Sequence, residues 1–277
     1  MSDEEIHRAW SDHGDDPSGV AERLAFLVEE LDVEHTSKVA LLIVHVVGEH
    51  LGQFERGLAM VDRLAHRARS ATDGGGLVLT SEAIDRALAL FRLCVGDTEG
   101  VEALLAQFGS RRQGQEAWIY ALAAGAVSAH GRIDDAVGWL QRAASLAFSV
   151  PDSDPAVRVL ATVSHDVACR FEVLSNPESG EATLLRTASQ FARVFWERGG
   201  TWLEVERAEH RLARTCLALN ERMGAVAHAE ACVALCRANA APEAELRAAL
   251  SVLSESREVA GDAPGAAAAR SEAAALR

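Results

Sequence analysis

The stretch AHGRIDDAVGWLQRAASLA, residues 129–147, contains the pattern that decides the fold. Gly131 comes shortly before a helical run in which Ala136, Leu140 and Ala143 recur at spacings of four and three. Glycine tolerates the left-handed backbone at a helix end, and this spacing places the three apolar side chains on one helix face. The stretch therefore predicts a tight turn followed by a helix that packs through small and medium-sized side chains.

The same pattern recurs along the chain at intervals of 35 to 45 residues. The turn residues are Gly52, Gly96, Gly131, Asn176, Asn220 and Gly261. Five positions after each turn the residue is small or modest in size, except at Glu181, and nine positions after it is apolar, except at Arg270. Six such units predict antiparallel helix pairs at about 35–70, 77–110, 113–149, 155–198, 201–239 and 243–277.

Four segments resemble the second helix of the tetratricopeptide family with its preceding turn. They are LGQFERGLAMVDRLAHR (51–67), AHGRIDDAVGWLQRAASLA (129–147), LNERMGAVAHAEACVAL (219–235) and AGDAPGAAAARSEAAAL (260–276). The resemblance covers roughly residues 35–277, with repeats longer than the ~34 residues typical of the family. It implies an all-α fold, a right-handed α-α superhelix of about six antiparallel helix pairs, whose first helices line a concave groove for a protein or peptide.

The chain shows no composition break that would separate two repeat domains. We expect an acidic, mobile N-terminus over residues 1–18 and one tetratricopeptide-like repeat domain over residues 19–277. That domain begins with a lone helix at 19–31, and the stretch TDGGG (72–76) predicts a loop. The lone helix has apolar residues on more than one side, so a homodimer remains an open alternative.

Composition limits the partners. The formal net charge is −14, which disfavours binding to nucleic acid. The N-terminus lacks the features of a secretory signal, and no uncharged apolar run approaches the ~20 residues of a membrane helix. We therefore expect a cytoplasmic protein without a membrane partner. The five cysteines are an odd number without C-x-x-C spacing, which predicts reduced thiols.

Polar residues gather on the predicted first helices of the fourth and fifth pairs. Spacings of three and four place the basic residues of the fifth pair in one cationic stripe, which residues of the fourth pair can face across the groove. The stripe is Arg207, His210, Arg211 and Arg214, and the facing residues are His165, Asp166 and Arg170. Guanidinium groups match carboxylate or phosphate, so we predict a site for a protein or peptide partner with an acidic or carboxylate group. In the alternative, the arginines pair with Glu204, Glu206 and Glu209 on an ordinary solvated helix face.

Histidines and cysteines also share helix faces. His165 with Cys169, and His228 with Cys232 and Cys236, have the spacing of four that could hold zinc or copper. However, Cys169 and Cys232 occupy positions that are alanine in sister repeats, where cysteine packs as a small hydrophobe. We therefore predict no metal and no cofactor, and we keep a small-ligand or metal-binding sensor as the alternative function.

The chain carries no local signature of a catalytic site. It contains no nucleophile elbow, HExxH motif or Cys/His/Asn signature. We therefore predict a scaffold or adaptor that is not an enzyme, and an enzyme on a helical scaffold is the least favoured alternative.

Overall fold

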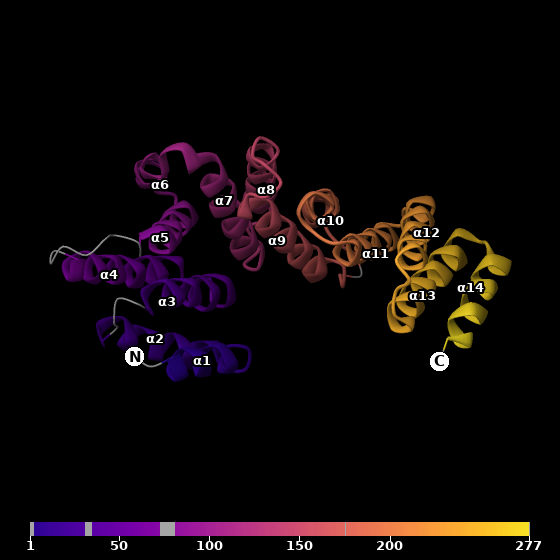
Figure 1. The fold of residues 1–277 in the computed structure, drawn as a ribbon, viewed down its shortest axis with the longest axis horizontal. Helices are drawn as coiled ribbons and strands as arrows, with labels where there is room; N and C mark the ends of the chain where they lie inside the picture. The colour runs from indigo at the N-terminus through magenta and orange to yellow at the C-terminus, as the bar shows by residue number, and fades with distance from the viewer. Residues whose placement is uncertain (1–2, 31–34, 73–80, 175, 277) are drawn as a thin grey trace. The chain divides into compact units, whose positions relative to one another are not determined.

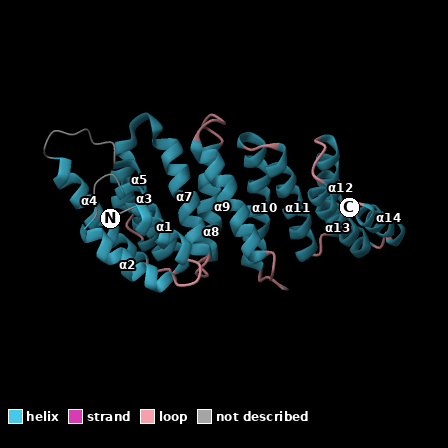
Figure 2. Ribbon diagram, turned by 60° about the horizontal axis from the view of Figure 1, so that its bottom comes forward, coloured by secondary structure: helices cyan, strands magenta, loops and turns pink. Residues whose placement is uncertain are grey.

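The fold is built from helices joined by short turns (Figures 1 and 2). The computed structural model describes residues 3–30, 35–72, 81–174 and 176–276, and these ranges contain no strand. The all-α prediction is therefore confirmed. Among the same residues, none of the helices combines the length and apolarity needed to span a membrane.

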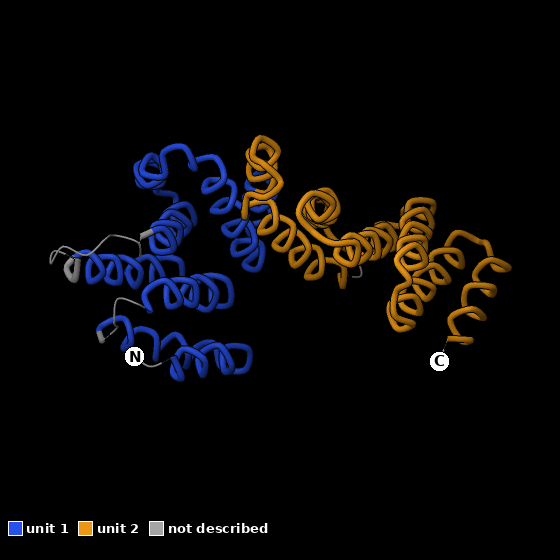
Figure 3. Tube along the Cα trace, viewed as in Figure 1, with its two compact units in different colours: residues 1–139 blue, residues 140–277 orange. Residues whose placement is uncertain are grey.

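The chain divides into two compact units, residues 1–139 and 140–277 (Figure 3). The repeat pattern predicts one domain over residues 19–277, and the sequence contains no signal for a boundary at this point. The boundary falls inside a helix, α8 (Ile133–Ala147), and not at a linker.

Unit 1 begins with a helix where the sequence analysis expected a mobile segment to residue 18. The helices of this unit that precede α8 are α1 (Asp3–Asp12), α2 (Pro17–Glu30), α3 (Thr36–Ile43), η2 (Val44–His50), α4 (Phe54–Thr72), α5 (Ser81–Val95), α6 (Thr98–Leu105), η3 (Ala106–Arg111) and α7 (Arg112–Ser128). Ile6 and Ala9 of α1 are buried, and α1 packs against α2 and α3. Helix α2 corresponds to the predicted lone helix at 19–31. Of the predicted loop at 72–76, residues 73–76 lie outside the described residues.

The segment η2 is a π-helix, in which the backbone N–H bonds five residues back. The N–H of Leu51 donates to the carbonyl of Val46 over 3.1 Å in this way. The side chain of Phe91 on α5 is fully buried and lies against Gly48 and Gly57, where an added Cβ would stand 3.1 Å and 2.2 Å from the ring. This contact explains the small residue predicted five positions after the first turn.

Unit 2 contains consecutive helix pairs. After the end of α8 come α9 (Pro155–Phe171), α10 (Ser179–Gly199), α11 (Trp202–Ala218), α12 (Arg222–Ala238), α13 (Glu243–Ala260) and α14 (Ala263–Ala275). Each first helix packs on its second helix, α9 on α10, α11 on α12 and α13 on α14. Helix α11 also contacts both α9 and α13, so the three first helices are neighbours, and we call their shared side the first-helix face.

The left-handed conformation predicted at the turns is present at five of the predicted turn residues. Gly52, Gly96, Gly131, Asn220 and Gly261 all have positive φ, from 58° to 86°.

Asn176 follows residue 175, which lies outside the described residues, and it belongs to the connection between α9 and α10, which is longer than the turn within each of the other pairs. Helix α10 starts with a capping box in which Glu178 and Glu181 exchange side-chain and backbone hydrogen bonds. Glu181 therefore caps a helix, which explains why it interrupts the pattern of small residues.

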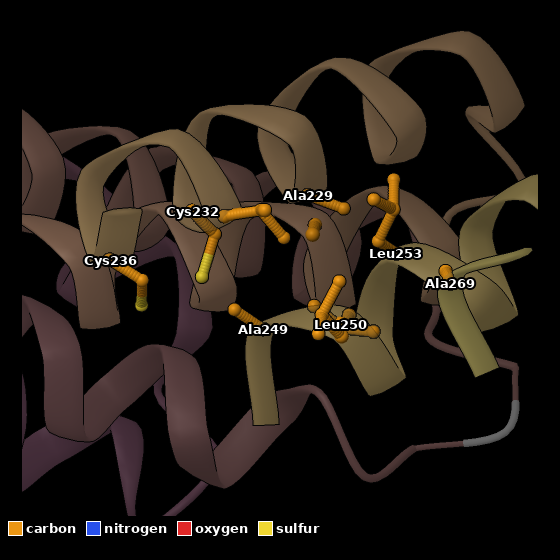
Figure 4. Close-up of a cluster of buried hydrophobic side chains, with 10 residues drawn as sticks. Ala229, Cys232, Cys236, Ala249, Leu250, Leu253 and Ala269 are labelled. Atoms are coloured by element: carbon orange, nitrogen blue, oxygen red, sulfur yellow. The ribbon is translucent and has the colours of Figure 1, made fainter. Parts of the chain in front are cut away.

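The core of unit 2 contains the two cysteines of α12 (Figure 4). Cys232 and Cys236 are 0% and 1% exposed and lie with Ala229, Leu250 and Leu253 in one cluster of buried side chains. Cys232 thus occupies a packing position, as the repeat register predicts, whereas Cys169 on α9 is only half-buried.

Candidate functional site

The predicted site residues lie on two neighbouring helices. His165, Asp166 and Arg170 are on α9, and Arg207, His210, Arg211 and Arg214 are on α11, which packs against α9. Both helices start at defined caps. The side chain of Asp154 accepts the backbone N–H of Ala156, and Thr201 forms a capping box with Glu204. These caps set the starting points of the two helices that carry the polar side chains.

Arg211 is the centre of the polar cluster. Its Nη1 forms an ion pair with Oε1 of Glu172, the residue that caps the C-terminus of α9. The two side chains are only 19% and 15% exposed, so this pair is shielded from water far more than a surface pair. Glu172 was not among the predicted site residues. Arg170, which was predicted to face the stripe, is half-buried on α9.

Two histidines adjoin Arg211. Burial lowers the pKa of His165, and the positive charge of Arg211 lowers it further. Burial and the charge of Arg211 lower the pKa of His210 in the same way. Both imidazoles are therefore favoured in the neutral form, in which one ring nitrogen accepts a hydrogen bond and the other donates one.

The cluster contains buried polar atoms that lack hydrogen-bond partners among the described residues. These atoms are Nδ1 of His165, Oε2 of Glu172 and Nε of Arg211. An unmet buried donor or acceptor costs about 1–3 kcal/mol, and such groups in folded proteins need an explanation. Three such atoms lie on side chains of one cluster, carried by the neighbouring helices α9 and α11 and by the residue that caps α9.

The other arginines of the stripe are paired with glutamates of α13. Nη2 of Arg207 lies 2.8 Å from Glu245, and Nη1 of Arg214 lies 2.6 Å from Glu255. The partners are thus not Glu204, Glu206 and Glu209, which the solvated-face alternative assigned. These pairs connect two helices, but their exposure limits each of them to about 0–1 kcal/mol.

The glutamates named in that alternative have other partners. Glu209 is buried between Arg193 of α10 and His228 of α12, at 2.5 Å and 2.7 Å. Burial opposes ionisation of Glu209, but the hydrogen bonds from His228 and Arg193 outweigh it and lower the pKa of this carboxyl. His228 is therefore engaged with Glu209, although the sequence analysis grouped it with Cys232 and Cys236.

Those two cysteines instead face Glu206 of α11. Sγ of Cys232 donates to Oε1 of Glu206 over 2.7 Å, and Sγ of Cys236 lies 3.6 Å from the same atom. Glu206 is 1% exposed, and burial raises its pKa although both thiols donate to it. His210 stands beside this group, with donor atoms of Glu206, His210 and Cys232 all within 4.8 Å of one another. The spacing of four between Glu206 and His210 is the sequence signal that could have revealed the grouping.

The fold and this site describe an all-α protein of helix pairs with a charged face on its first helices. No family model matches the chain, and no curated protein matches it. A solved structure similar to this chain is the crystal structure of BtubC (BKLC) from P. vanneervenii, with 20% sequence identity over 81% of this chain and 91% of that chain. The TM-score is 0.45, and at this value the likeness carries no conclusion about this chain.

Proposed function

We propose that this chain is a binding module that holds a protein or peptide segment on the first-helix face of unit 2, without catalysing a reaction. The observation that carries the proposal is the cluster of His165, Glu172 and Arg211, with its unmet hydrogen-bonding atoms. An acidic group of the partner would bond to the guanidinium of Arg211 in place of Glu172. The pairs of Arg207 and Arg214 with α13 extend the charged face to a third helix, a length suited to a segment rather than a small ligand.

Glu172 and a partner carboxylate would compete for Arg211, so two variants should change the affinity for the partner in opposite directions. Arg211→Gln removes the cation, and it should weaken binding of an acidic segment about 30-fold or more, as for other shielded charge pairs. Glu172→Gln removes the internal competitor while it keeps the side-chain shape, so it should strengthen binding.

To test this, a library of synthetic peptides with free C-terminal carboxylates is screened for binding. The affinity of the selected peptides is then measured by fluorescence anisotropy. The matched control is Arg237→Gln on α12, which breaks an exposed pair with Glu272 away from the cluster and should leave the affinity unchanged. Equal affinities for wild type, Arg211→Gln and Glu172→Gln would overturn the proposal.

A second candidate function is a metal-responsive regulator that uses Glu206, His210 and Cys232. The observation in its favour is the grouping of a carboxylate, an imidazole and a thiol within 4.8 Å, donor types that zinc accepts. Against it, burial and the neighbouring Glu206 raise the pKa of the Cys232 thiol, and a thiol must lose its proton to bind a metal. Metal analysis of the protein before and after Cys232→Ala decides this candidate, which fails if the variant retains the same metal content.

A further inference from the structure

Three histidines of unit 1 lie together, far along the sequence from the charged cluster of unit 2. His13 belongs to the turn after α1, and His45 and His50 belong to the π-helix η2. One ring nitrogen of each lies within 4.8 Å of the others, and the ring centroids are 4.7 to 5.2 Å apart. Trp10 covers one side of the group, stacked on His45 at 5.4 Å.

The π-helix is what brings two of these histidines together. In an α-helix, five residues advance about 500°, so His45 and His50 would point about 140° apart. The wider π turn instead places residues five apart on nearly the same side, and π turns are frequent at functional sites. The carbonyl of Glu49 accepts a hydrogen bond from Nε2 of His130 over 2.9 Å, which holds this end of η2 against the turn after α7.

The nitrogens have the spacing of ligands on one metal ion. Nε2 of His45 and Nε2 of His50 lie 3.2 Å apart. Two imidazole nitrogens bound to one tetrahedral zinc at 2.0–2.1 Å stand about 3.3 Å apart. The distance between these two nitrogens is therefore compatible with a shared ion, which would replace the proton of the hydrogen bond between them.

Hydrogen bonds also orient two of the rings for ligation. Nδ1 of His45 lies 2.8 Å from Oε2 of Glu49, and Nδ1 of His13 lies 2.6 Å from the carbonyl oxygen of Trp10. Each oxygen accepts, so Nδ1 carries the proton in both rings and Nε2 presents its lone pair. A carboxylate or carbonyl behind the ring is the usual arrangement for a histidine that binds a metal.

We propose that His13, His45 and His50 bind a divalent transition-metal ion of the zinc class, with Glu49 and the Trp10 carbonyl orienting the rings. Imidazole ligands favour zinc and its neighbours over magnesium or calcium, which prefer oxygen. Three protein ligands leave a fourth position on the ion for water or an external group. The bound ion would join the turn after α1 to the first helix pair. This site is independent of the segment-binding function proposed for unit 2.

The test uses the full chain, stripped with chelator and titrated with Zn²⁺ by calorimetry and with Co²⁺ by absorption. We carry it out in wild type and in a Cys232→Ala background, which removes the thiol donor of the Glu206 group. One equivalent should bind in both, and the Co²⁺ spectrum should show nitrogen and oxygen ligands without a thiolate charge-transfer band.

Variants then assign the site. The double variant His45→Ala, His50→Ala should no longer bind this equivalent of Zn²⁺. His13→Gln should weaken Zn²⁺ binding without a change within a helix, because His13 lies in the turn after α1. Glu49→Gln should weaken binding about 10- to 100-fold. The matched control is His66→Ala, an exposed histidine of α4, which should bind as wild type does. The proposal is overturned if the folded His13→Gln protein binds Zn²⁺ as tightly as wild type, or if all binding disappears with Cys232→Ala.

Discussion

Glu206 lies in an environment that its sequence context does not predict. Its position in the polar stretch VERAEHRLART (205–215) is typical of a solvated helix face, yet the side chain is buried with two thiols as donors. The repeat register predicted a small buried residue at position 232. However, the spacing of residues within one helix does not specify which side chain of a neighbouring helix contacts each position. The partners Glu172, Glu245 and Glu255 were missed for the same reason.

Replacement of Glu206 by glutamine should make the protein more stable at pH 8. Burial raises the pKa of Glu206 above that of an unfolded chain, so the folded state holds the proton more tightly and loses stability as pH rises past the unfolded pKa. Glutamine removes this penalty and keeps the shape. Urea denaturation at pH 8 and pH 4 measures the difference in the free energy of unfolding between wild type and the glutamine variant. A stabilisation that is as large at pH 4 as at pH 8 would contradict this explanation.

The cysteines should react slowly in the folded protein. Burial raises the pKa of Cys94 and Cys236 to about 12 and that of Cys216 to about 11, which leaves little thiolate at pH 8. Cys169 is the least buried and should be alkylated first. Mass spectrometry after timed alkylation gives the order, and early modification of Cys94 or Cys236 in the native protein would be inconsistent with their burial.

At the scale of elements, the turns were predictable and the irregular segments were not. A left-handed turn has a local chemical cause, a residue without a Cβ penalty, so Gly52 and Gly131 reveal it directly. The π-helix η2 has no such local signal, because KVALLIVHVV (38–47) is an almost continuous apolar run without glycine or proline, which does not distinguish a π turn from an α turn. Its residues contact side chains that are distant in the sequence, Phe91 and His130. The three-histidine group depends on η2 and was missed with it.

Two glycine substitutions near one turn should change stability in opposite directions. A Cβ at Gly131 or Gly138 meets nothing within 4 Å, so neither change is limited by space. Gly131 has φ of 74°, and Gly131→Ala should cost about 1–2 kcal/mol. Gly138 lies inside α8, and Gly138→Ala should add about 0.5–1 kcal/mol. Thermal denaturation compares the two, and a shift of the same sign in both would show that backbone conformation is not the cause.

At the scale of the whole molecule, the six helix pairs were predictable, but the division into two compact units was not. The pairs follow from a repeated pattern of turn and small residues, which the burial of Leu140, Ala225 and Ala229 matches. The boundary at residues 139 and 140 depends on the contacts between helices, and the repeat continues across it without a change in composition.

The stability of the protein should fall as pH drops below about 6.5, the ordinary pKa of histidine. The pKa values of His165 and His210 are lowered in the folded state, so the unfolded chain takes up these protons first and gains stability relative to the fold. Replacement of both by glutamine should flatten the decline between pH 7 and pH 5. Chemical denaturation across this range measures it, and an equally steep decline in the double variant would assign the effect to other groups.

The most direct test of the segment-binding function is the footprint of a bound peptide on the histidine side chains. Imidazole signals in the NMR spectrum of histidine-labelled protein are assigned by His165→Gln and His210→Gln, and a peptide selected for binding is then added to saturation. The signals of His165 and His210 should shift, while that of His66 on α4 stays in place. If the peptide binds and the signals of His165 and His210 do not change, the first-helix face of unit 2 is not the binding surface.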